Sequence, residues 1–514
     1  MNWLLLINLL VPLVCGLLIP PVKPLRERKA LRFFTGGAVL LTAVLTAAAV
    51  IPGKSSLTLF NLLPDCPVYF RTDGPGRLFA ALTVSMWCLS TLFSFEYMNH
   101  EEKESRYQTF SLMSLAALLG VCYSGNLITT YLFYELMTLA TFPLVMHEQT
   151  KEAISGGMTY LYYSIAGAFL GLVGIFFMNA CADETEREGG RLAYAAGGFL
   201  KENLSSSETR VLLAVSLLML VGLSAKAGMF PLHGWLPKAH PVAPAPASAL
   251  LSGNITKMGI LFVIRVIFYS LGADFLKDTW VEYTLLSFAA LTVLLGSALA
   301  WREKLFKKRL AYSTVSQTSY ILLGIYMLEP TALTGGLMHV VFHSVIKNLL
   351  FLAAGAVIYS TGETRVDRIG GVGRRLPVTM WCFTVASLSL VGIPPTSAFI
   401  SKWYLAMGAL KRGLPVFRYL VPVCLLLSAL LTAGYLFSVT VKAFFVPRHE
   451  EEENGISTEI ENPEGYLTAS ERTYSEVPPK MLVPLVILAA LSLLFGLFPG
   501  ILSGLLDRFV PSLF

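Results

Sequence analysis

The chain has 514 residues, of which 55% are hydrophobic and 14% are charged, whereas about 25% of residues are charged in an ordinary soluble protein. So few charges could not cover the surface of a soluble protein of this size. The apolar content also excludes intrinsic disorder. The net charge of +6 falls in connections between apolar runs and does not indicate a nucleic-acid partner. The composition therefore predicts a polytopic protein of a lipid bilayer.

The apolar runs have the length of transmembrane helices, each of which needs about 20 residues. They are continuous rather than alternating, which excludes a membrane β-barrel. We predict an all-α polytopic fold with about fourteen transmembrane helices. Their expected ranges are 2–20, 32–52, 76–96, 108–124, 126–146, 154–181, 209–229, 243–271, 282–301, 308–328, 331–360, 377–405, 415–445 and 480–503. The cysteines form no CxxC pair, so they indicate neither a metal nor a redox site.

Basic residues give these spans an orientation. The first, ninth and eleventh connections are rich in lysine and arginine, and all odd-numbered connections lie on one side of the membrane. The positive-inside rule makes that side cytoplasmic, so both termini face outward from the inner membrane. Lys411 and Arg412, in an even-numbered connection, violate the rule. Residues 446–479 should form an acidic cytoplasmic loop, either a solvated segment or a docking element for a partner subunit.

Several titratable residues fall within the predicted spans, although a charge at the bilayer centre costs at least about 2.5–3.5 kcal/mol. The residues are Glu135 in the fifth span, Lys226 in the seventh, Lys257 in the eighth, His339, His343 and Lys347 in the eleventh, and Lys402 in the twelfth. The three residues of the eleventh span recur at intervals of four, which places them on one helical face. Arg265 lies nearer an interface, and we interpret it as structural.

Two predicted spans contain prolines that interrupt the helix. Pro231 lies at the end of the seventh span, just beyond its expected last residue, and Pro394 and Pro395 lie in the twelfth. Breaks five spans apart predict an internal repeat of five helices, and an odd number of spans gives the two copies inverted topology. The expected organisation is a three-helix segment over 1–107, one five-helix repeat over 108–271, a second, inverted repeat over 282–445, the acidic loop 446–479 and a C-terminal helix over 480–514.

One carboxylate and several lysines spread over five helices at similar depth are suited to proton hopping. Lysine releases its proton more readily when it is desolvated, and histidine can relay protons between neighbours. We therefore predict a proton path through the seven residues, with ordered water in the gaps. We further expect Glu135 and Lys226 to form a pair, within about 4–6 Å directly or through a water molecule.

The segment from Ala225 to Gly259 begins Ala-Lys-Ala-Gly-Met-Phe-Pro-Leu-His-Gly-Trp-Leu-Pro-Lys-Ala-His. It closely resembles the signature of the antiporter-like membrane subunits of respiratory complex I. The same family includes the large subunits of Mrp-type multisubunit sodium/proton antiporters and of membrane-bound energy-converting hydrogenases. Tyr134–Glu135, the residues from Pro394 to Ser397 and those from His339 to Lys347 also resemble the family's pattern. The resemblance covers about residues 75–445.

The resemblance implies a fourteen-helix core with two inverted five-helix repeats and a proton path through the seven residues named above. Gln317 lies where some relatives place a histidine. The implied role is a proton-translocating subunit of a larger complex, with sodium as a second cargo in Mrp-type assemblies. The chain would have no catalytic chemistry, cofactor or metal of its own, and its partners would be other membrane subunits. The motif and Lys402 favour the Mrp-like or hydrogenase-like group.

Two alternatives remain open at the level of sequence. One is a stand-alone secondary transporter with a substrate site at the broken helices. The other is a structural subunit whose charges are inherited but idle. Neutralising the charges distinguishes the second alternative from a proton path, because only a path would lose ion movement.

Overall fold

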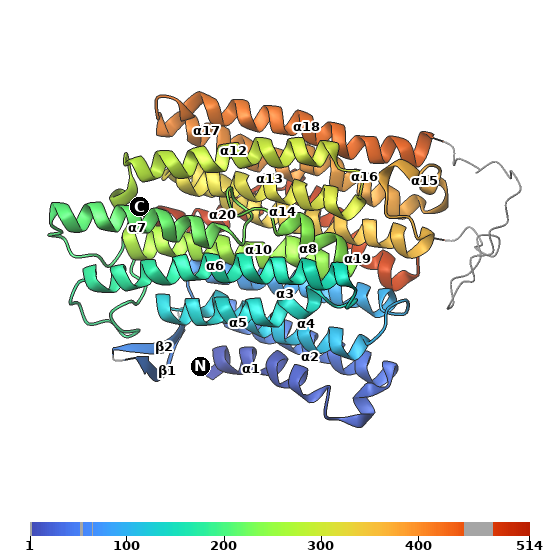
Figure 1. Cartoon of the computed structure of the whole chain (residues 1–514), viewed down its shortest axis with the longest axis horizontal. Helices are drawn as coiled ribbons and strands as arrows, with labels where there is room; N and C mark the ends of the chain where they lie inside the picture. The colour runs from blue at the N-terminus through green and yellow to red at the C-terminus, as the bar shows by residue number, and fades with distance from the viewer. Residues whose placement is uncertain (1–2, 52–54, 64, 447–475) are drawn as a thin grey trace, which may run out of the picture.

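The structure is a computed structural model that describes residues 3–51, 55–63, 65–446 and 476–514. Long helices lie side by side and share one main direction (Figure 1). Within the described residues, ten helices are long and apolar enough to cross a membrane. The predicted helical membrane fold is confirmed at this level. The acidic run at 450–453 lies outside the described residues.

The long helices follow the predicted spans closely. The N-terminal part contains α1 (Trp3–Leu18), η1 (Lys23–Arg26), α2 (Arg28–Val50), β1 (Ser56–Leu63), β2 (Cys66–Arg71) and α3 (Gly74–Tyr97). The next part contains α4 (Glu104–Tyr123), α5 (Leu127–Val145), α6 (Lys151–Cys181), α7 (Ser206–Ser224), α8 (Leu236–Val242), α9 (Ala245–Leu250), η2 (Leu251–Ile255), α10 (Thr256–Ile264) and η3 (Arg265–Leu271).

The second half has the same character. It contains α11 (Ala273–Leu276), α12 (Trp280–Arg302), α13 (Phe306–Tyr326), α14 (Pro330–Thr361), η4 (Val366–Arg368), α15 (Val372–Arg375), α16 (Pro377–Val391), α17 (Ser397–Arg412) and α18 (Phe417–Phe445). The C-terminal part contains α19 (Pro479–Leu497), α20 (Gly500–Leu506) and η5 (Val510–Leu513).

An antiparallel hairpin of β1 and β2 corrects the expectation of an all-α chain. In β1, buried Leu57 is followed by exposed Thr58, half-buried Leu59 and exposed Phe60, whereas β2 is buried continuously from Cys66 to Phe70. A period of two is the signal of a strand. The segment was too short for a transmembrane helix, and reading it only as a connection missed this pattern.

Both predicted helix breaks are present. The seventh span divides into α7 and α8 around Pro231, and the twelfth divides into α16 and α17 around Pro394 and Pro395. Each break contains a glycine with a positive φ, 77° at Gly228 and 87° at Gly392. L side chains rarely adopt this conformation, so glycine ends the first half of each helix.

The most deeply buried helices lie at the centre of the bundle. Each of the ten candidate membrane spans among the described residues contains an apolar stretch of 18 residues. In the continuous helical segment from Ala245 to Leu271 this stretch is 100% buried, and in α14 it is 94% buried, whereas in α2 it is 33% buried. Two π-helical turns, η2 and η3, flank α10 in the first of these segments. Outer helices expose large apolar side chains, such as Phe33 on α2 and Leu426 on α18. A surface of this kind fits lipid rather than water.

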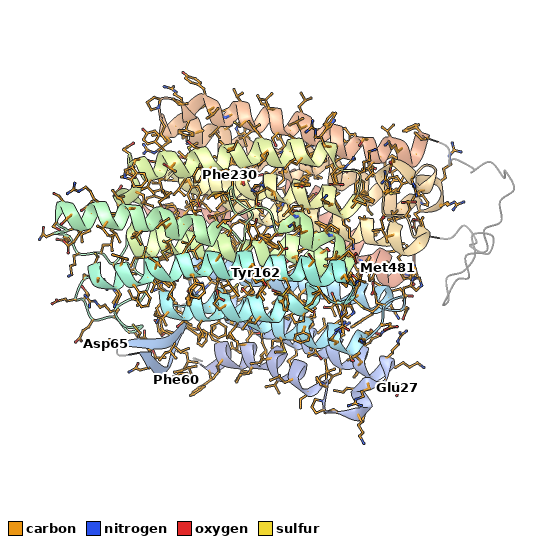
Figure 2. All side chains as sticks on the ribbon, viewed as in Figure 1. Glu27, Phe60, Asp65, Tyr162, Phe230 and Met481 are labelled. Atoms are coloured by element: carbon orange, nitrogen blue, oxygen red, sulfur yellow. The ribbon has the colours of Figure 1, made fainter. Side chains whose placement is uncertain are left out.

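The two ends of the bundle differ. Glu27, in the first basic connection, and Asp65, in the hairpin turn, lie at opposite ends in Figure 2, and Tyr162 and Phe230 lie between them. At the end that carries Glu27, a β-bridge between Leu305 and Arg365 joins the ninth and eleventh connections. We call this the basic end. The opposite, hairpin end carries the hairpin and the polar connection between α6 and α7, as the Arg191 amide donates to the Asp65 carbonyl.

Candidate functional site

Lys226 lies in the break between α7 and α8 and is 1% exposed. Its ammonium donates to three hydroxyl groups, Thr138 Oγ1 at 2.6 Å, Ser164 Oγ at 3.1 Å and Tyr160 Oη at 3.3 Å. Helix α10 packs closely here, because a Cβ on Gly259 would come within 2.9 Å of the Lys226 Cβ. The break therefore holds a buried ammonium among neutral oxygens.

Lys257 and His343 meet at the centre of the bundle. Both are fully buried, and Lys257 Nζ lies 2.6 Å from His343 Nδ1. The same ammonium donates to the Ser252 carbonyl in the π-turn η2. A π-turn shifts the backbone bonds from i→i+4 to i→i+5 and is frequent at functional sites. The second ring nitrogen of His343 has no hydrogen-bond partner among the described residues.

The row continues from His343 to Lys402 through two further rings. The rings of His343 and His339 stack with centres 5.8 Å apart, and those of His339 and Tyr320 with centres 5.4 Å apart. The Lys402 ammonium lies 5.3 Å from the centre of the Tyr320 ring. His339 Nδ1 also lies 2.8 Å from Ser401 Oγ, one residue before Lys402. Side chains from α10, α14, α13 and α17 thus form one continuous row.

Lys402 lies on α17, just after the break in the twelfth span, and its ammonium reaches back to the end of α16. Its ammonium donates to the carbonyls of Leu390 at 2.7 Å and Val391 at 2.8 Å. These are the last residues of α16, whose carbonyls have no partner further along the helix. A Cβ on Gly392 would lie 3.1 Å from Lys402 Cδ, so the glycine leaves room for the side chain. Lys402 is half-buried, whereas we expected it to be deep.

Lys347 forms a branch beside the row. It is fully buried and donates to the Leu310 carbonyl at 2.9 Å and to Ser313 Oγ at 2.7 Å. The Tyr435 hydroxyl donates to the same serine oxygen at 2.8 Å. Lys347 and His343 share one face of α14, as their spacing predicted. Within the described residues, no carboxylate forms an ion pair with any of the four lysines of the predicted path.

Glu135 stands apart from the other predicted residues. It lies half-buried on α5, near exposed Leu136 and Leu139, and its Oε1 has no hydrogen-bond partner among the described residues. The carboxylate and the Lys226 ammonium act on each other electrostatically. No ion pair forms within 4.0 Å, however, and the expected separation of about 4–6 Å, directly or through a water molecule, stays a prediction.

Sequence reasoning missed the hydroxyl groups that surround the lysines. They are Thr138, Tyr160, Ser164, Ser313, Tyr320, Ser401 and Tyr435. The polar face of α13 could have been found from the sequence, because Ser313, Gln317 and Tyr320 recur at intervals of four and three, the spacing of one helical face. Gln317 Oε1 lies 3.1 Å from His339 Nε2, so this polar face of α13 meets α14.

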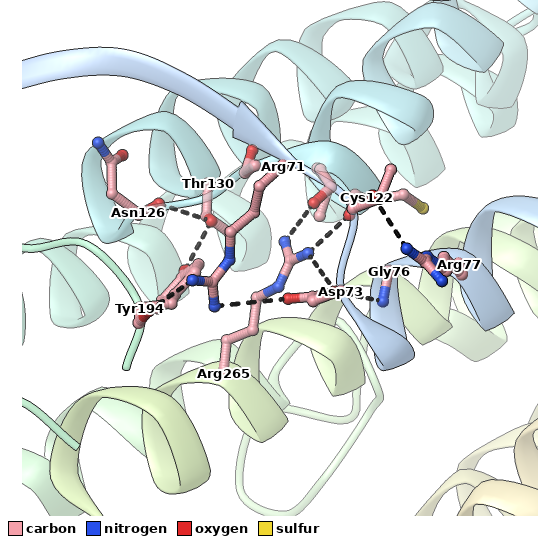
Figure 3. A network of polar contacts seen from close by, with 12 residues as sticks. Arg71, Asp73, Gly76, Arg77, Cys122, Asn126, Thr130, Tyr194 and Arg265 are labelled. Carbon is pink, nitrogen blue, oxygen red and sulfur yellow. Dashed lines mark hydrogen bonds and ion pairs between the residues drawn. The ribbon is translucent and has the colours of Figure 1, made fainter. Parts of the chain in front are cut away.

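A second buried cluster of charges lies at the N-terminus of α3 (Figure 3). Fully buried Arg265 donates to the Cys122 carbonyl at 2.6 Å and forms an ion pair with Asp73 at 3.4 Å. Asp73 in turn accepts from the Gly76 amide at 2.6 Å and caps the helix. Arg71 donates to the Tyr194 carbonyl and also lies 4.0 Å from Asp73. This cluster joins several helix ends, which agrees with the structural role expected for Arg265.

The comparisons with known proteins agree with this geometry. Residues 124–432, more than half of the chain, match the model of the family described as NADH:quinone oxidoreductase/Mrp antiporter, TM. The chain belongs to this family. The match confirms the resemblance stated from the motifs, and it includes every residue of the predicted path.

Individual members of the antiporter family extend the match. NADH-quinone oxidoreductase subunit N of Desulforudis audaxviator (strain MP104C) is 34% identical over 80% of this chain and 77% of its own length. Hydrogenase-4 component B of Escherichia coli (strain K12) is 31% identical over 82% of this chain and 61% of its own length. A chain in the structure of the Mrp complex from Dietzia sp. DQ12-45-1b shares the fold, with a TM-score of 0.81 and 22% identity over 99% of this chain and 98% of that chain.

Proposed function

We propose that this chain is a proton-translocating subunit of a multisubunit membrane complex of the Mrp antiporter, energy-converting hydrogenase or complex I type, with sodium as a second cargo in an Mrp-type assembly. The observation that carries the proposal is the row of Lys257, His343, His339, Tyr320 and Lys402, whose members contact or stack on one another. Such buried groups are costly in a membrane and mark functional sites.

The partners of the lysines support proton transfer. Hydroxyls, carbonyls and an imidazole surround them, and such neutral groups tolerate both the ammonium and the amine. An ion-paired carboxylate would favour the ammonium and hold the proton. Histidine accepts a proton at one ring nitrogen and can release the proton of the other, so His343 and His339 suit a relay. Lys226 and Lys347 lie beside the row and donate to hydroxyl groups as well, Tyr160 and Ser313.

We include in the proposal the finer architecture, with about fourteen spans and two inverted repeats over 108–271 and 282–445. The third helix of each run of five is long, 31 residues in α6 and 32 in α14. The fourth is broken in each, between α7 and α8 and between α16 and α17, with a lysine at or next to the break. The remaining divisions are 1–107, the loop 446–479 and 480–514.

The basic end faces the cytoplasm of the inner membrane in this proposal. The basic first, ninth and eleventh connections support that orientation through the positive-inside rule. Both termini lie toward the opposite end of the bundle (Figure 1) and therefore face outward. The hairpin of β1 and β2 belongs to that outer side.

Other membrane subunits are the partners that fit the two lateral edges. The path residues at these edges, Glu135 on α5 and Lys402 on α17, are half-buried, whereas the interior residues are at most 1% exposed. Helices α5 and α17 lie on opposite sides of the bundle (Figure 1). A titratable group that faces lipid is costly, so a neighbouring subunit at either edge would bury it at lower cost.

A stand-alone secondary transporter is the weaker alternative. A cavity of about 400 Å³ lies beside α17 and is lined by Phe399, Ile400, Trp403, Tyr404, Pro499 and Ser503. These side chains are mostly apolar and include no residue of the row. A substrate site at the broken helices would instead place the polar groups of the break in the cavity.

The test is proton flux in vesicles that contain the complex purified through a tag on this chain. Lys347→Met removes a titrating group, and we expect flux to fall by about 100-fold, the scale on which a proton-transfer group contributes. Lys201→Met, a partly exposed lysine in the connection before α7, serves as the matched control. Near-normal flux in an assembled Lys347→Met complex would contradict the proposal. The co-purified subunits identify the parent complex: iron–sulfur and nickel subunits indicate hydrogenase, and nicotinamide-oxidising subunits indicate complex I.

A further inference from the structure

A polar cavity of about 170 Å³ lies at the basic end, between the connection from α3 to α4 and that from α5 to α6. Its lining consists of His100, Glu101, Glu102, Lys103, Arg106, His147, Glu148 and Gln149. Two carboxylates here, Glu101 and Glu148, lie within electrostatic range of Lys307 at the start of α13. No residue of the path described above belongs to this cavity.

Glu101 is a group of this cavity that changes charge near neutral pH. Burial and the Glu148 carboxylate raise the pKa of Glu101 to about 7, against the opposing effect of the Lys307 charge. Desolvation at the cavity also raises the pKa of Glu148, although part of its side chain is exposed. Burial and the Arg106 charge lower the pKa of His147 to about 4, so this ring is neutral in the same range. We therefore expect the carboxyl groups of Glu101 and Glu148, and not the His147 ring, to exchange protons with the solvent at physiological pH.

Lys307 joins the cavity to the interior of the bundle. Its ammonium donates to the Ala243 carbonyl at 2.8 Å, at the junction of α8 and α9. The Ser248 hydroxyl donates to the same oxygen at 3.3 Å and to the His240 carbonyl at 3.0 Å. The charge of Lys307 thus lies between the carboxyl groups and the end of α8, the helix that follows the first break.

His240 is the next polar group inward, and the path described above does not use it. The side chain is fully buried, and neither ring nitrogen has a hydrogen-bond partner among the described residues. Its ring stacks on Phe351 with centres 4.7 Å apart, and the Lys347 ammonium lies 5.9 Å from the centre of the same phenyl ring. Lys307, Lys347 and Lys257 all lie within electrostatic range of His240. Burying an imidazole whose two nitrogens have no partner costs free energy, so such a group calls for a functional explanation.

We propose that this cavity and His240 form the uptake route by which protons pass from the basic end to Lys347. The inference rests on the proposed function and adds the residues that feed the row. Glu101 and Glu148 exchange protons with the solvent, and Lys307 balances their charge. Neutral His240 accepts a proton at one ring nitrogen and releases the proton of the other to the neutral amine of Lys347, and rotation of the ring restores the first tautomer. Water would bridge the gaps between these groups.

Proton flux in vesicles containing the purified complex tests the route, measured from the basic end across a range of pH. The double variant Glu101→Gln/Glu148→Gln should slow uptake about tenfold above pH 7, the lower bound of what charged, focusing surfaces add to an on-rate. The loss should shrink as the pH falls, because bulk protons become abundant. Glu152→Gln, an exposed carboxyl at the start of α6 that does not line the cavity, is the matched control.

His240→Gln tests the inner step, with a loss of about 100-fold expected at every pH because a relay group is missing. Lys347→Met separates the two proposals. If Lys347→Met abolishes flux while the double variant and His240→Gln both behave as wild type, the uptake route is wrong and the proposed function stands. If Lys347→Met retains flux, the proposed function is wrong, and the uptake route is wrong as well because it depends on that function. If the His240→Gln complex fails to assemble, the double variant still tests the route, because wild-type uptake above pH 7 in that variant contradicts it.

Discussion

Lys257 and Arg265 lie on the same buried helical segment, two turns apart, and their surroundings differ. Arg265 is held by the Asp73 carboxylate and by the carbonyls at the end of α4. Lys257 contacts the imidazole of His343 and the Ser252 carbonyl, and no carboxylate of the described residues forms an ion pair with it. Both side chains are 0% exposed, so depth alone does not separate them.

The difference shows how one helix can carry a permanent charge and a titrating one. Arginine keeps its proton in proteins, and a paired carboxylate with fixed donors makes its charge part of the structure. Lysine can lose its proton, and neutral partners tolerate both of its states. The Arg265 cluster should therefore govern assembly, and the lysine row should govern transport.

The largest expected effect comes from Lys257→Met. Removal of the amine interrupts the row at its direct contact with His343, so we expect proton flux to fall by about 100-fold or more. Stability should be unchanged or slightly higher, because an unpaired buried charge is lost. Flux in reconstituted vesicles and thermal unfolding of the same preparation measure the two quantities. Lost assembly with residual flux in the surviving complex would reverse the assignment.

Lys402→Arg separates charge from titration at the edge of the row. Arginine retains the positive charge and can donate to the Leu390 and Val391 carbonyls, but it does not release a proton. We expect flux to fall by nearly the same factor as in Lys402→Ala, about 100-fold. Lys402→Glu should retain partial flux, since a buried carboxyl also titrates. Near-normal flux in Lys402→Arg would show that only the charge is required.

Arg265→Met should have the opposite profile to Lys257→Met. It breaks the ion pair with Asp73, which keeps only the more distant Arg71 at 4.0 Å as a cationic partner. Loss of one partner of a buried pair typically costs about 3–5 kcal/mol, and the half-buried Asp73 should place the cost at the lower end of this range. We expect a lower unfolding temperature and less assembled complex, and normal flux per assembled complex. The double variant Arg265→Met/Asp73→Asn should recover part of the stability. A stable Arg265→Met complex that cannot move protons would place Arg265 in the path.

Gly392→Ala should have a smaller effect, confined to one break. The residue has φ 87°, and an added Cβ would lie 3.1 Å from Lys402 Cδ. The backbone strain alone costs about 1–2 kcal/mol, and displacement of the ammonium should reduce flux further. Gly362→Ala is the control, because its φ is 73° and nothing lies within 4 Å of the added Cβ. Equal flux in the two variants would mean that the contact with Lys402 is unimportant.

The smallest expected effect is a pH dependence of stability from Glu101. Its pKa is about 7 in the folded chain and about 4.3 when unfolded. Between these values the folded state binds more protons, so the free energy of unfolding decreases as the pH rises. Thermal unfolding from pH 4 to pH 8 should show this slope, and Glu101→Gln should flatten it. An unchanged slope would indicate that Glu101 is ionised throughout.

Most of the fold could be predicted from the sequence, because each span needs a continuous apolar run and each break contains a glycine and a proline. It also placed His339, His343 and Lys347 on one face of α14, since helical spacing alone decides that question. The hairpin was missed because its alternation is short. The three hydroxyl groups that surround Lys226 could not be predicted. Thr138, Tyr160 and Ser164 come from two other helices, and no sequence pattern distinguishes them from ordinary polar residues.

The half-buried states of Lys402 and of Glu135 could not be predicted from the sequence either. Hydropathy gives the depth of a residue along the membrane normal, and Glu135 lies at a central position of its span. It does not give the direction in which a side chain points around the helix when the helix is apolar on all sides. Only the packing of α5 and α17 at the edges of the bundle determines that exposure.

The row from Lys257 to Lys402 crosses the helices instead of following them, since its members come from α10, α14, α13 and α17. Helix axes approximate the membrane normal, so the row lies close to the plane of the bilayer. A transmembrane voltage does work of about 2.3 kcal/mol per 100 mV on an elementary charge only along the normal. A proton that moves along the row therefore does almost no electrical work, and the voltage acts on the two short steps that join the row to the aqueous phases.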